Sequence, residues 1–345
     1  MNIPLKANQL DAYLVSYDAN IRYLTGFPAG ESWLLVLPKK SFYITDFRYI
    51  EEAKKGLPKS VTVYRYEKSV FKSVFELARK YKVKNLGFDD RHVSLSFFKR
   101  LQKECPKGIK LIVKNGLVEN LRQVKTKQEI SYIRKALQIH DQAYQYLRPF
   151  IKPGTSEKEL FAKLEGFVKA KGVGFSFTPI IASGPNSALP HAKVTDRRFQ
   201  RNDVVLIDMG IDYKGYKSDL TRMVFLGKIP QLVRDVNAKV KSAQLKAIAK
   251  IRAGVKASDV DYEARNYLAK NHLAKYFGHS LGHGVGLEIH EDPRLSSANT
   301  DVLQENVVIT VEPAVYIPNK FGIRIEDMVV VTKTGCEVLS DYIDQ

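Results

Sequence analysis

Short apolar segments alternate with helix-patterned segments over residues 1 to about 114. The segments SWLLVLP (32–38) and SFYITDF (41–47) predict a hairpin, because turn residues separate two apolar runs. Helices are predicted over FRYIEEAKKG (47–56) and SLSFFKRLQKEC (94–105), and a further helix is predicted to begin at Ser69. Strands are predicted over VTVYRYE (61–67), VKNLGFD (83–89) and KLIVKNG (110–116). This alternation is typical of an α/β domain.

The segment KNGLVENLRQVKT (114–126) is predicted to be a linker. Thr126 and Glu129 have the spacing of a capping box, which predicts the start of a long helix that ends near Pro149. We therefore expect an N-terminal domain over residues 1–120 and a second domain over residues 121–345.

The second domain contains a repeat with an offset of about 100 residues. Segments beginning at Ile151 and Ile251 each follow a long helical pattern and carry Gly three residues later. Two capping-box patterns, Ser156 with Glu159 and Ser258 with Asp261, predict a second helix in each copy. An apolar hairpin pattern carrying acids follows both helix pairs, so the simplest account is a duplicated helix-helix-hairpin unit.

Bulk composition narrows the class of protein. A chain of 345 residues with 44% hydrophobic content is expected to fold into packed domains, and no apolar run approaches the ~20 residues of a membrane span. The start lacks a signal-peptide pattern, and two distant cysteines suit the reducing cytoplasm. The net charge of +18 is spread over lysine-rich helix faces, so we do not expect a nucleic-acid partner.

Four acids lie at corresponding places in the two hairpins: Asp208, Asp219, Glu312 and Glu326. A turn centred on Tyr213-Lys214 would make the first two cross-strand neighbours, and a turn centred on Asn319 would do the same for the last two. Paired carboxylates on apolar strands need a compensating cation. One possibility is that each acid forms an ion pair with an arginine, and Arg222 and Arg324 are available. The other is a metal site, which would account for all four acids together.

The segment LGHGVGLEIHEDP (281–293) adds imidazole groups to this set of acids. It has neither a phosphate-binding glycine pattern nor the zinc helix H-E-x-x-H, and its glycines disfavour a helix. We predict a strand, in which His283 and His290, seven residues apart, face opposite sides unless a bulge realigns them. His191 and His279 lie in similar apolar segments marked by Gly or Pro.

A series of motifs in this order resembles that of the pita-bread metallopeptidases, which include Xaa-Pro dipeptidases (prolidases), aminopeptidase P and methionine aminopeptidase. The motifs are LPHA (189–192), VVLIDMGIDYKGYKSDLTRMVFLG (204–227), HSLGHGVGLEIHEDP (279–293), ITVEPAVYIP (309–318) and FGIRIEDMVVVTKTG (321–335). NIRYLTGF (20–27), ITDFRYIEEA (44–53) and LRQVKTKQEISYIRKA (121–136) resemble the proline-specific branch. The resemblance implies an N-terminal creatinase-like α/β domain followed by a pita-bread catalytic domain, α/β plus α+β in class.

The resemblance also implies a dinuclear metal site. Asp208 and Asp219 would bind one ion and His283 and Glu312 the other, with Asp219 and Glu326 bridging both. Thr221 matches a hydroxyl that supports the cluster. The implied catalytic residues are Glu312 as proton carrier, and His290 and His191 as substrate- and transition-state-contacting groups.

Two features depart from the branch without removing a ligand. Ala314 stands where Gly is usual after Glu-Pro, and Phe321 precedes Gly322 where a second Gly is common. Ala314 would matter only if that backbone needs a positive φ.

We expect metal-dependent hydrolysis of the Xaa-Pro bond, and favour a dipeptidase over an aminopeptidase acting on longer peptides. A dipeptidase needs a cation for the substrate carboxylate, and the candidates are Arg294 and Arg324, with His279 as a further substrate-binding residue. Either arginine could instead pair with neighbouring acids. Creatinase-like chemistry without metal and a non-catalytic binding protein remain alternatives. The expected cofactor is two divalent ions, Mn before Co, Zn or Fe, and the family implies a homodimer.

Overall fold

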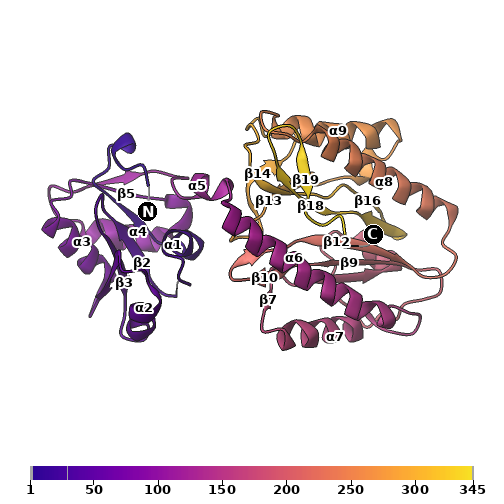
Figure 1. The fold of residues 1–345 in the computed structure, drawn as a ribbon, viewed down its shortest axis with the longest axis horizontal. Coiled ribbons are helices and arrows are strands. Elements are labelled where there is room, and N and C mark those ends of the chain that lie inside the picture. Colours follow the sequence, from indigo (N-terminus) through magenta and orange to yellow (C-terminus); the bar gives the residue numbers. More distant parts are fainter. Residues whose placement is uncertain (1–2, 29, 344–345) are drawn as a thin grey trace. The chain divides into compact units, whose positions relative to one another are not determined.

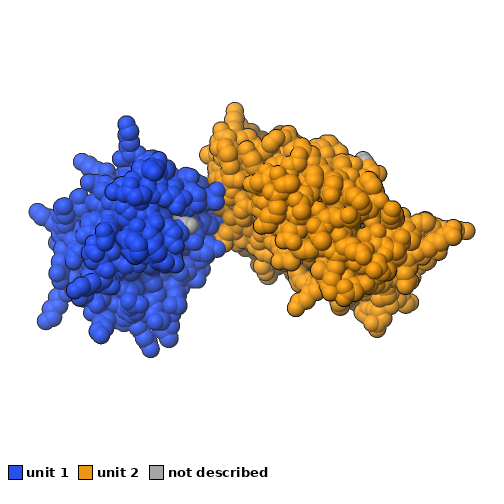
Figure 2. Space-filling view, turned by 90° about the horizontal axis from the view of Figure 1, so that it is seen from below, with its two compact units in different colours: residues 1–122 blue, residues 123–345 orange. Residues whose placement is uncertain are grey.

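The computed structural model describes residues 3–28 and 30–343. By contacts between Cα atoms, the chain divides into two compact units, residues 1–122 and residues 123–345 (Figure 2). The sequence predicts this boundary after residue 120. Within the described ranges, no helix is both long and apolar enough to cross a membrane.

The first unit is built on a six-stranded mixed sheet with the order β4-β3-β2-β1-β5-β6. Its elements are η1 (Lys6–Asn8), β1 (Ala12–Val15), α1 (Asp18–Thr25), β2 (Trp33–Val36), β3 (Ser41–Thr45), α2 (Ile50–Gly56), β4 (Val61–Arg65), α3 (Val70–Lys80), β5 (Asn85–Phe88), η2 (Asp90–His92), α4 (Leu95–Glu104), β6 (Lys110–Val113) and α5 (Glu119–Gln123). The predicted β2–β3 hairpin is confirmed. Strand β1 and helix α1 are additions to the sequence prediction.

Both faces of this sheet are covered. Along β1, Ala12 and Leu14 belong to one apolar core, whereas Tyr13 and Val15 belong to another. Alternation along a strand places successive side chains on opposite faces, so each face has its own core. This explains why the strands read as nearly continuous apolar runs rather than alternating ones.

The segment predicted to be a linker has secondary structure of its own. Helix α5 (Glu119–Gln123) lies within it, and Val124 forms an isolated antiparallel bridge with Val307 of the second unit's sheet. Lys125 donates its backbone N–H to Asn306. The predicted linker thus contains secondary structure, and the division between the two units, after residue 122, lies within it.

The second unit begins with helices α6 and α7, which precede a three-stranded antiparallel sheet with the order β12-β9-β8. The elements of this half are α6 (Lys127–Leu147), η3 (Arg148–Phe150), α7 (Glu157–Ala170), β7 (Gly174–Phe175), β8 (Ile180–Ser183), η4 (Gly184–Ala188), β9 (Val204–Met209), β10 (Ile211–Tyr213), β11 (Tyr216–Lys217) and β12 (Leu220–Phe225). The long helix predicted from Thr126 to about Pro149 is confirmed as α6.

The other half repeats this order with helices α8 and α9 and a sheet whose central strands are β13, β15 and β18. Its elements are α8 (Gln231–Lys250), α9 (Ala257–Lys270), η5 (Ala274–Tyr276), β13 (Gly282–Gly284), β14 (Glu291–Leu295), β15 (Val308–Val311), β16 (Ala314–Ile317), β17 (Phe321–Arg324), β18 (Asp327–Val331) and β19 (Cys336–Val338). In Figure 1, α7 and the pair α8 and α9 lie at opposite edges of this unit, with the strands between them.

The two halves share backbone details as well as element order. Gly154 and Gly254 have φ values of 96° and 89°, a conformation that favours glycine. Each donates its N–H to a carbonyl in the loop before a central strand, Phe199 in the first half and Leu303 in the second. This correspondence confirms the predicted duplication at an offset of 100 (254 − 154).

The capping boxes differ between the halves. Thr126 with Glu129 and Ser156 with Glu159 both form the reciprocal side-chain bonds. The box predicted from Ser258 and Asp261 was wrong, because α9 begins at Ala257 and its N-cap residue, Lys256, makes no side-chain cap. Asp261 instead binds Arg265 and the backbone N–H of Leu281.

Candidate metal centre

The four predicted acids lie where the strands of the two halves meet. Asp208 lies on β9 and Asp219 immediately precedes β12, whereas Glu312 follows β15 and Glu326 precedes β18. Figure 1 shows β9, β12 and β18 together between the helices of the second unit. Each hairpin brings its own two acids together, and the packing of one hairpin against the other then brings acids more than 100 residues apart into one region.

The two hairpin registers differ in how well the sequence predicts them. Pairs Val311↔Asp327 and Ala314↔Arg324 flank Glu312 and Glu326 and place them opposite each other, as the turn centred on Asn319 predicts. The predicted pairing of Asp208 with Asp219 was wrong, because Asp208 pairs with Thr221. A shift of two residues keeps both carboxylates on the same face of the sheet.

His283 joins the acids from β13. Its Nε2 lies 3.5 Å from Oδ2 of Asp219 and 3.4 Å from Oε1 of Glu312. Its other nitrogen, Nδ1, is 3.1 Å from the carbonyl of Gly284, which fixes Nδ1 as the donor and leaves the Nε2 lone pair free to face the carboxylates. One ligand atom each from Asp219, His283 and Glu326 lies within 4.8 Å of the others.

Asp208 is oriented by Arg324. The guanidinium NH2 lies 2.6 Å from Oδ2 of Asp208, whereas the other carboxylate oxygen, Oδ1, is buried and has no hydrogen-bond partner among the described residues. A buried oxygen without a donor is costly unless a cation or water satisfies it. Oδ1 is therefore an open ligand atom.

Thr221 connects the arginine to the last acid. Its hydroxyl donates to Oε2 of Glu326 at 2.8 Å and accepts from Nε of Arg324 at 2.9 Å. Thr221 and Glu326 are both buried. The hydroxyl that the resemblance implies as a support for the cluster is thus in contact with a predicted ligand.

Burial changes the proton affinity of the whole cluster. It raises the pKa of Glu312 to about 8, and raises the pKa of Asp219 and Glu326 well above the ordinary carboxyl range, with repulsion between the acids adding to the effect. The pKa of Asp208 is raised by burial despite the neighbouring Arg324. Burial lowers the pKa of His283 to about 4, so the imidazole is neutral and able to act as a ligand near pH 7.

The charges do not balance without a cation. With all four carboxylates ionised, as metal ligands must be, these groups and the one guanidinium paired among them, Arg324, would carry −4 + 1 = −3, and the raised pKa values show how costly that charge is without a cation. Oxygen donors with one imidazole form a set that suits divalent ions such as Mn²⁺. The open Oδ1 atom of Asp208, the charge surplus and the neutral His283 all fit a divalent metal site.

His290 lies beside the predicted ligand His283. Their ring centroids are 4.4 Å apart and the rings are nearly perpendicular. The continuous strand predicted over 281–293 was wrong, because residues 285–290 leave the strand as a series of bends and the register shifts between Gly282 and Gly284. This irregularity brings the two histidines together, which was the alternative left open by the sequence.

His191 and His279 reach the same region from different elements. His191 is exposed in the loop before β9, near enough to Asp208 and His290 to interact electrostatically with both. His279 is half-buried, and its Nε2 lies 3.3 Å from the hydroxyl of Tyr316. Burial lowers the pKa of His279 to about 4.

The two predicted carboxylate-binding arginines have different surroundings. Arg324 is 4% exposed, and its guanidinium bonds to Asp208, Thr221, Tyr316 and the Pro190 carbonyl. A guanidinium that is buried and fully bonded in this way is not accessible to a substrate carboxylate. Arg324 therefore fits the other possibility, an ion pair with a neighbouring acid, here Asp208. Arg294 is exposed, and forms no ion pair with another described residue.

Comparison with known proteins shows the family to which the chain belongs. Residues 131–333 match metallopeptidase family M24, and residues 4–124 match the creatinase/prolidase N-terminal domain. The chain is a member of metallopeptidase family M24. It is 36% identical to an Xaa-Pro dipeptidase of Pyrococcus horikoshii over 337 residues, which cover 96% of this chain and 93% of the relative.

Solved structures of M24 peptidases share the whole fold. An Xaa-Pro dipeptidase from Bacillus anthracis matches with a TM-score of 0.94 at 34% identity, covering 99% of this chain and 96% of the other. An X-Pro aminopeptidase from Thermotoga maritima matches with a TM-score of 0.89 at 37% identity, covering 96% of each chain. The predicted fold, a creatinase-like domain followed by the pita-bread domain, is confirmed.

The two departures from the M24 motifs are accommodated. Ala314 lies on β16 and Phe321 on β17, and neither has a positive φ. The backbone after Glu312 therefore does not need glycine.

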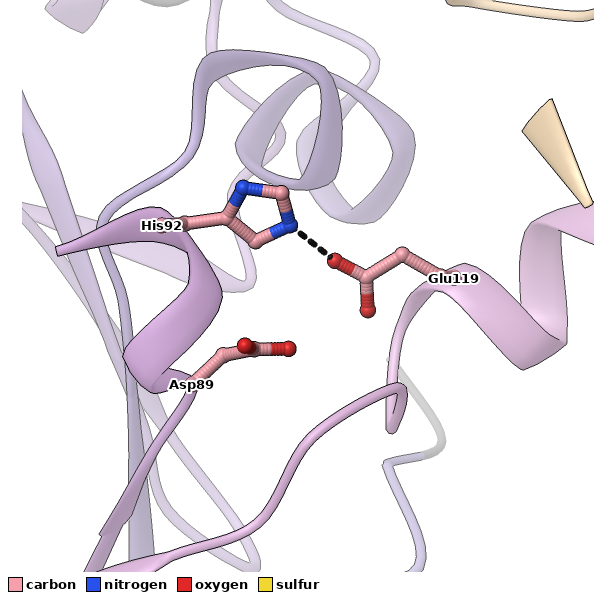
Figure 3. Close-up of side chains that lie close together, drawn as sticks. All are labelled: Asp89, His92 and Glu119. Carbon is pink, nitrogen blue, oxygen red and sulfur yellow. Dashed lines mark hydrogen bonds and ion pairs between the residues drawn. The ribbon is translucent and has the colours of Figure 1, made fainter. Parts of the chain in front are cut away.

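A second group of possible ligands lies in the N-terminal domain, outside the M24 catalytic region. Figure 3 shows His92 directed toward Glu119, with Asp89 beside them. Arg91 binds both oxygens of Asp89 at 3.1 and 2.7 Å, and Oε1 of Glu119 accepts from His92 at 2.6 Å and from Asn20 at 2.8 Å. Because these donors already engage the carboxylates, we assign the group to an ion-pair network, which sequence reasoning missed.

Proposed function

We propose that this M24 peptidase hydrolyses the Xaa-Pro peptide bond and prefers dipeptides. The observation that carries the proposal is the buried cluster of four carboxylates and a neutral imidazole, with an open oxygen on Asp208. The relatives named Xaa-Pro dipeptidase in Pyrococcus horikoshii and Bacillus anthracis support the choice of substrate, because they match over nearly the whole chain.

The cofactor we propose is two divalent ions per chain, Mn²⁺ before Co²⁺, Zn²⁺ or Fe²⁺. Asp208 and Asp219 would hold one ion, His283 and Glu312 the other, and Asp219 and Glu326 both. Support comes from the short approach of His283 to Asp219 and Glu312 and from the surplus of negative charge. When bound, such ions make water a stronger acid and polarise the peptide carbonyl.

The residues of the chain would then move the proton and stabilise the developing charge. We assign Glu312 as the group that takes a proton from the attacking water and passes it to the leaving nitrogen. As an ionised carboxylate beside the bound ions, Glu312 can accept a proton from the water and release it to the leaving group. His290 and His191 are exposed beside the cluster, where they could donate to the carbonyl oxygen as it becomes an oxyanion.

The preference for dipeptides rests on Arg294. Its exposed side chain follows His290 by four residues on β14, and its charge is felt by the imidazole of His290. An exposed guanidinium near His290 can bind the carboxylate of a C-terminal proline. His279, bonded to Tyr316, is a less direct candidate for substrate contact.

The experiment that tests this proposal compares Xaa-Pro with Xaa-Pro-Xaa peptides, with Mn²⁺ present. Faster hydrolysis of the dipeptide is expected. Faster hydrolysis of the tripeptide would make the protein an Xaa-Pro aminopeptidase, and cleavage of neither would favour a non-catalytic binding protein of the same fold.

Assembly and compartment are part of the proposal. We infer a homodimer from the family and a cytoplasmic location from the cysteines, since Cys105 and Cys336 are both free thiols. Membrane and nucleic-acid partners are not proposed. Sedimentation of the purified chain tests the dimer, because a monomer mass would contradict it.

A further inference from the structure

A buried carboxylate, Glu157, anchors the loop that carries His191. Glu157 is the first residue of α7 and is 0% exposed. The loop begins at Ser183, where β8 ends, and returns to Glu157 at Thr195. His191 lies between these two points of attachment.

Five hydrogen bonds converge on the carboxylate of Glu157. Oε1 accepts from the backbone N–H and the hydroxyl of Ser183 at 2.7 and 2.8 Å. Oε2 accepts from the backbone N–H and the hydroxyl of Thr195 at 2.9 and 2.7 Å, and from Nδ2 of Asn186 at 2.9 Å. Oε1 therefore holds the start of the loop at Ser183, and Oε2 joins Asn186 near the start to Thr195 at the end.

No lysine or arginine forms an ion pair with Glu157 across the described ranges. The Glu157 carboxylate is thus stabilised by hydrogen bonds from the loop alone, and all five of these donors share it as their acceptor. Hydrogen bonds to an ionised acceptor are stronger than those between neutral groups. Loss of either carboxylate oxygen would leave buried donors at one end of the loop without a partner.

The tip of the same loop contacts the metal centre. Arg324, which binds Asp208, also donates to the carbonyl of Pro190 at 3.1 Å, directly before His191. The backbone N–H of Gly322 donates to the hydroxyl of Ser187 at 2.9 Å. The loop is therefore fixed at its base by Glu157 and near its tip by residues of β17.

The second repeat lacks this carboxylate. Ala257 occupies the equivalent position, since its N–H donates to Asp301 as that of Glu157 donates to Arg197. The helix pair and the following sheet thus form without an acid at this position. The carboxylate serves the loop of the first repeat alone.

We propose that Glu157 is a positioning residue for hydrolysis, which acts by fixing His191 at the metal centre. This inference rests on the proposed role of His191 in contacting the reacting peptide. It assigns to Glu157 no contact with metal or substrate. A displacement of about 1 Å in a catalytic group can lower the rate by about a hundredfold, so loosening the loop is enough to impair hydrolysis.

The test compares Glu157→Gln with the unmodified chain, both loaded with Mn²⁺. The amide turns an NH₂ group toward loop donors, so exchange of the amide hydrogens of residues 184–195 should accelerate. The kcat for an Xaa-Pro dipeptide should fall about tenfold or more, while the bound Mn²⁺ per chain stays the same. Thr195→Val, which removes one donor, is a milder variant expected to change both quantities in the same direction.

A double-mutant comparison separates positioning from general destabilisation. If Glu157 acts through His191, Glu157→Gln should lower kcat no further in a His191→Ala background. Glu159→Ala is the matched control, because it removes the Glu159 side chain from the capping box of the same helix and leaves the Glu157 bonds intact; it should lower the unfolding temperature without changing kcat. Unchanged kcat in Glu157→Gln, or additive losses in the double variant, would overturn the proposal. If His191→Ala hydrolyses normally, the role of His191 fails, and the exchange measurement still decides whether Glu157 anchors the loop.

Discussion

Arg222 and Asp327 occupy equivalent positions in the two repeats and form a buried ion pair with each other. Their NH2 and Oδ1 atoms are 2.9 Å apart, and their side chains are 1% and 4% exposed. Arg222 pairs with Ile207 on β9, and Asp327 pairs with Val311 on β15, so each occupies the same place in its hairpin. The residues directly before them, Thr221 and Glu326, are also in contact.

This ion pair holds the two halves of the metal centre together, which gives a stability prediction. Arg222→Met leaves the Asp327 carboxylate buried without its cation, and breaking a buried pair in this way costs about 3–5 kcal/mol. We expect a correspondingly lower free energy of unfolding in urea. The double variant Arg222→Met with Asp327→Leu should recover part of the loss. A single variant within about 0.5 kcal/mol of the unmodified protein would contradict this account.

The metal-free protein should lose stability as the pH rises from 7 to 8. Burial raises the pKa of Glu312 to about 8, so the folded state keeps a proton that the unfolded state has already released. The stabilisation is therefore complete at low pH and is lost as the pH approaches 8, by about 1 kcal/mol over this interval. Urea unfolding at the two pH values measures it, and Glu312→Gln should reduce the dependence. An unfolding free energy that increases over the interval would count against a protonated Glu312.

Because metal binding must displace those protons, the apparent affinity for Mn²⁺ should increase over the same interval. His283 does not oppose this trend, since its lowered pKa of about 4 keeps it neutral throughout. Titration calorimetry in two buffers of different ionisation enthalpy measures the released protons. Binding without proton release would show that the carboxylates are already ionised in the metal-free protein.

Arg294 should separate dipeptides from longer substrates. Arg294→Ala removes the exposed cation near His290, so KM for an Xaa-Pro dipeptide is expected to rise by about tenfold, the effect of losing one charge-assisted contact. KM for an Xaa-Pro-Xaa peptide should change little, because its carboxylate lies one residue further on. Equal effects on both peptides would show that Arg294 does not recognise the carboxylate.

The two adjacent histidines should have separable effects. His283→Ala is expected to lose bound Mn²⁺ and hydrolysis together, because its Nε2 faces Asp219 and Glu312. His290→Ala should keep the metal and lose rate, by about a hundredfold if it supplies one oxyanion donor. Metal content by mass spectrometry and kcat measured on the same samples test both. Loss of metal in His290→Ala would reassign it as a ligand.

The sequence predicts one hairpin better than the other for a local reason. Asn319, at the centre of the second turn, has a φ of 60°, a conformation that Asn adopts readily. The first turn is formed by Lys214 and Gly215, with φ values of 52° and 86°. Because Lys rarely adopts a positive φ, the sequence favours a turn one residue too early, and the predicted register of Asp208 and Asp219 is two residues off.

Long-range partners account for the other differences. The sequence around Arg324 cannot show whether its guanidinium binds a substrate or an acid of the chain. The partner found in the structure, Asp208, lies 116 residues away in the chain. Glu157 offers no signal either, because an acid in the first turn of a helix is common. Its role becomes visible only when the loop from Ser183 to Thr195 returns to it.

The most direct test of a dinuclear hydrolytic site is a Mn²⁺ titration of the metal-stripped protein, with hydrolysis of an Xaa-Pro dipeptide followed in parallel. The geometry of Asp208, Asp219, His283, Glu312 and Glu326 predicts two ions bound per chain, with hydrolysis appearing as the sites fill. Fewer than one tightly bound ion per chain, or hydrolysis that is the same with and without metal, would contradict the account.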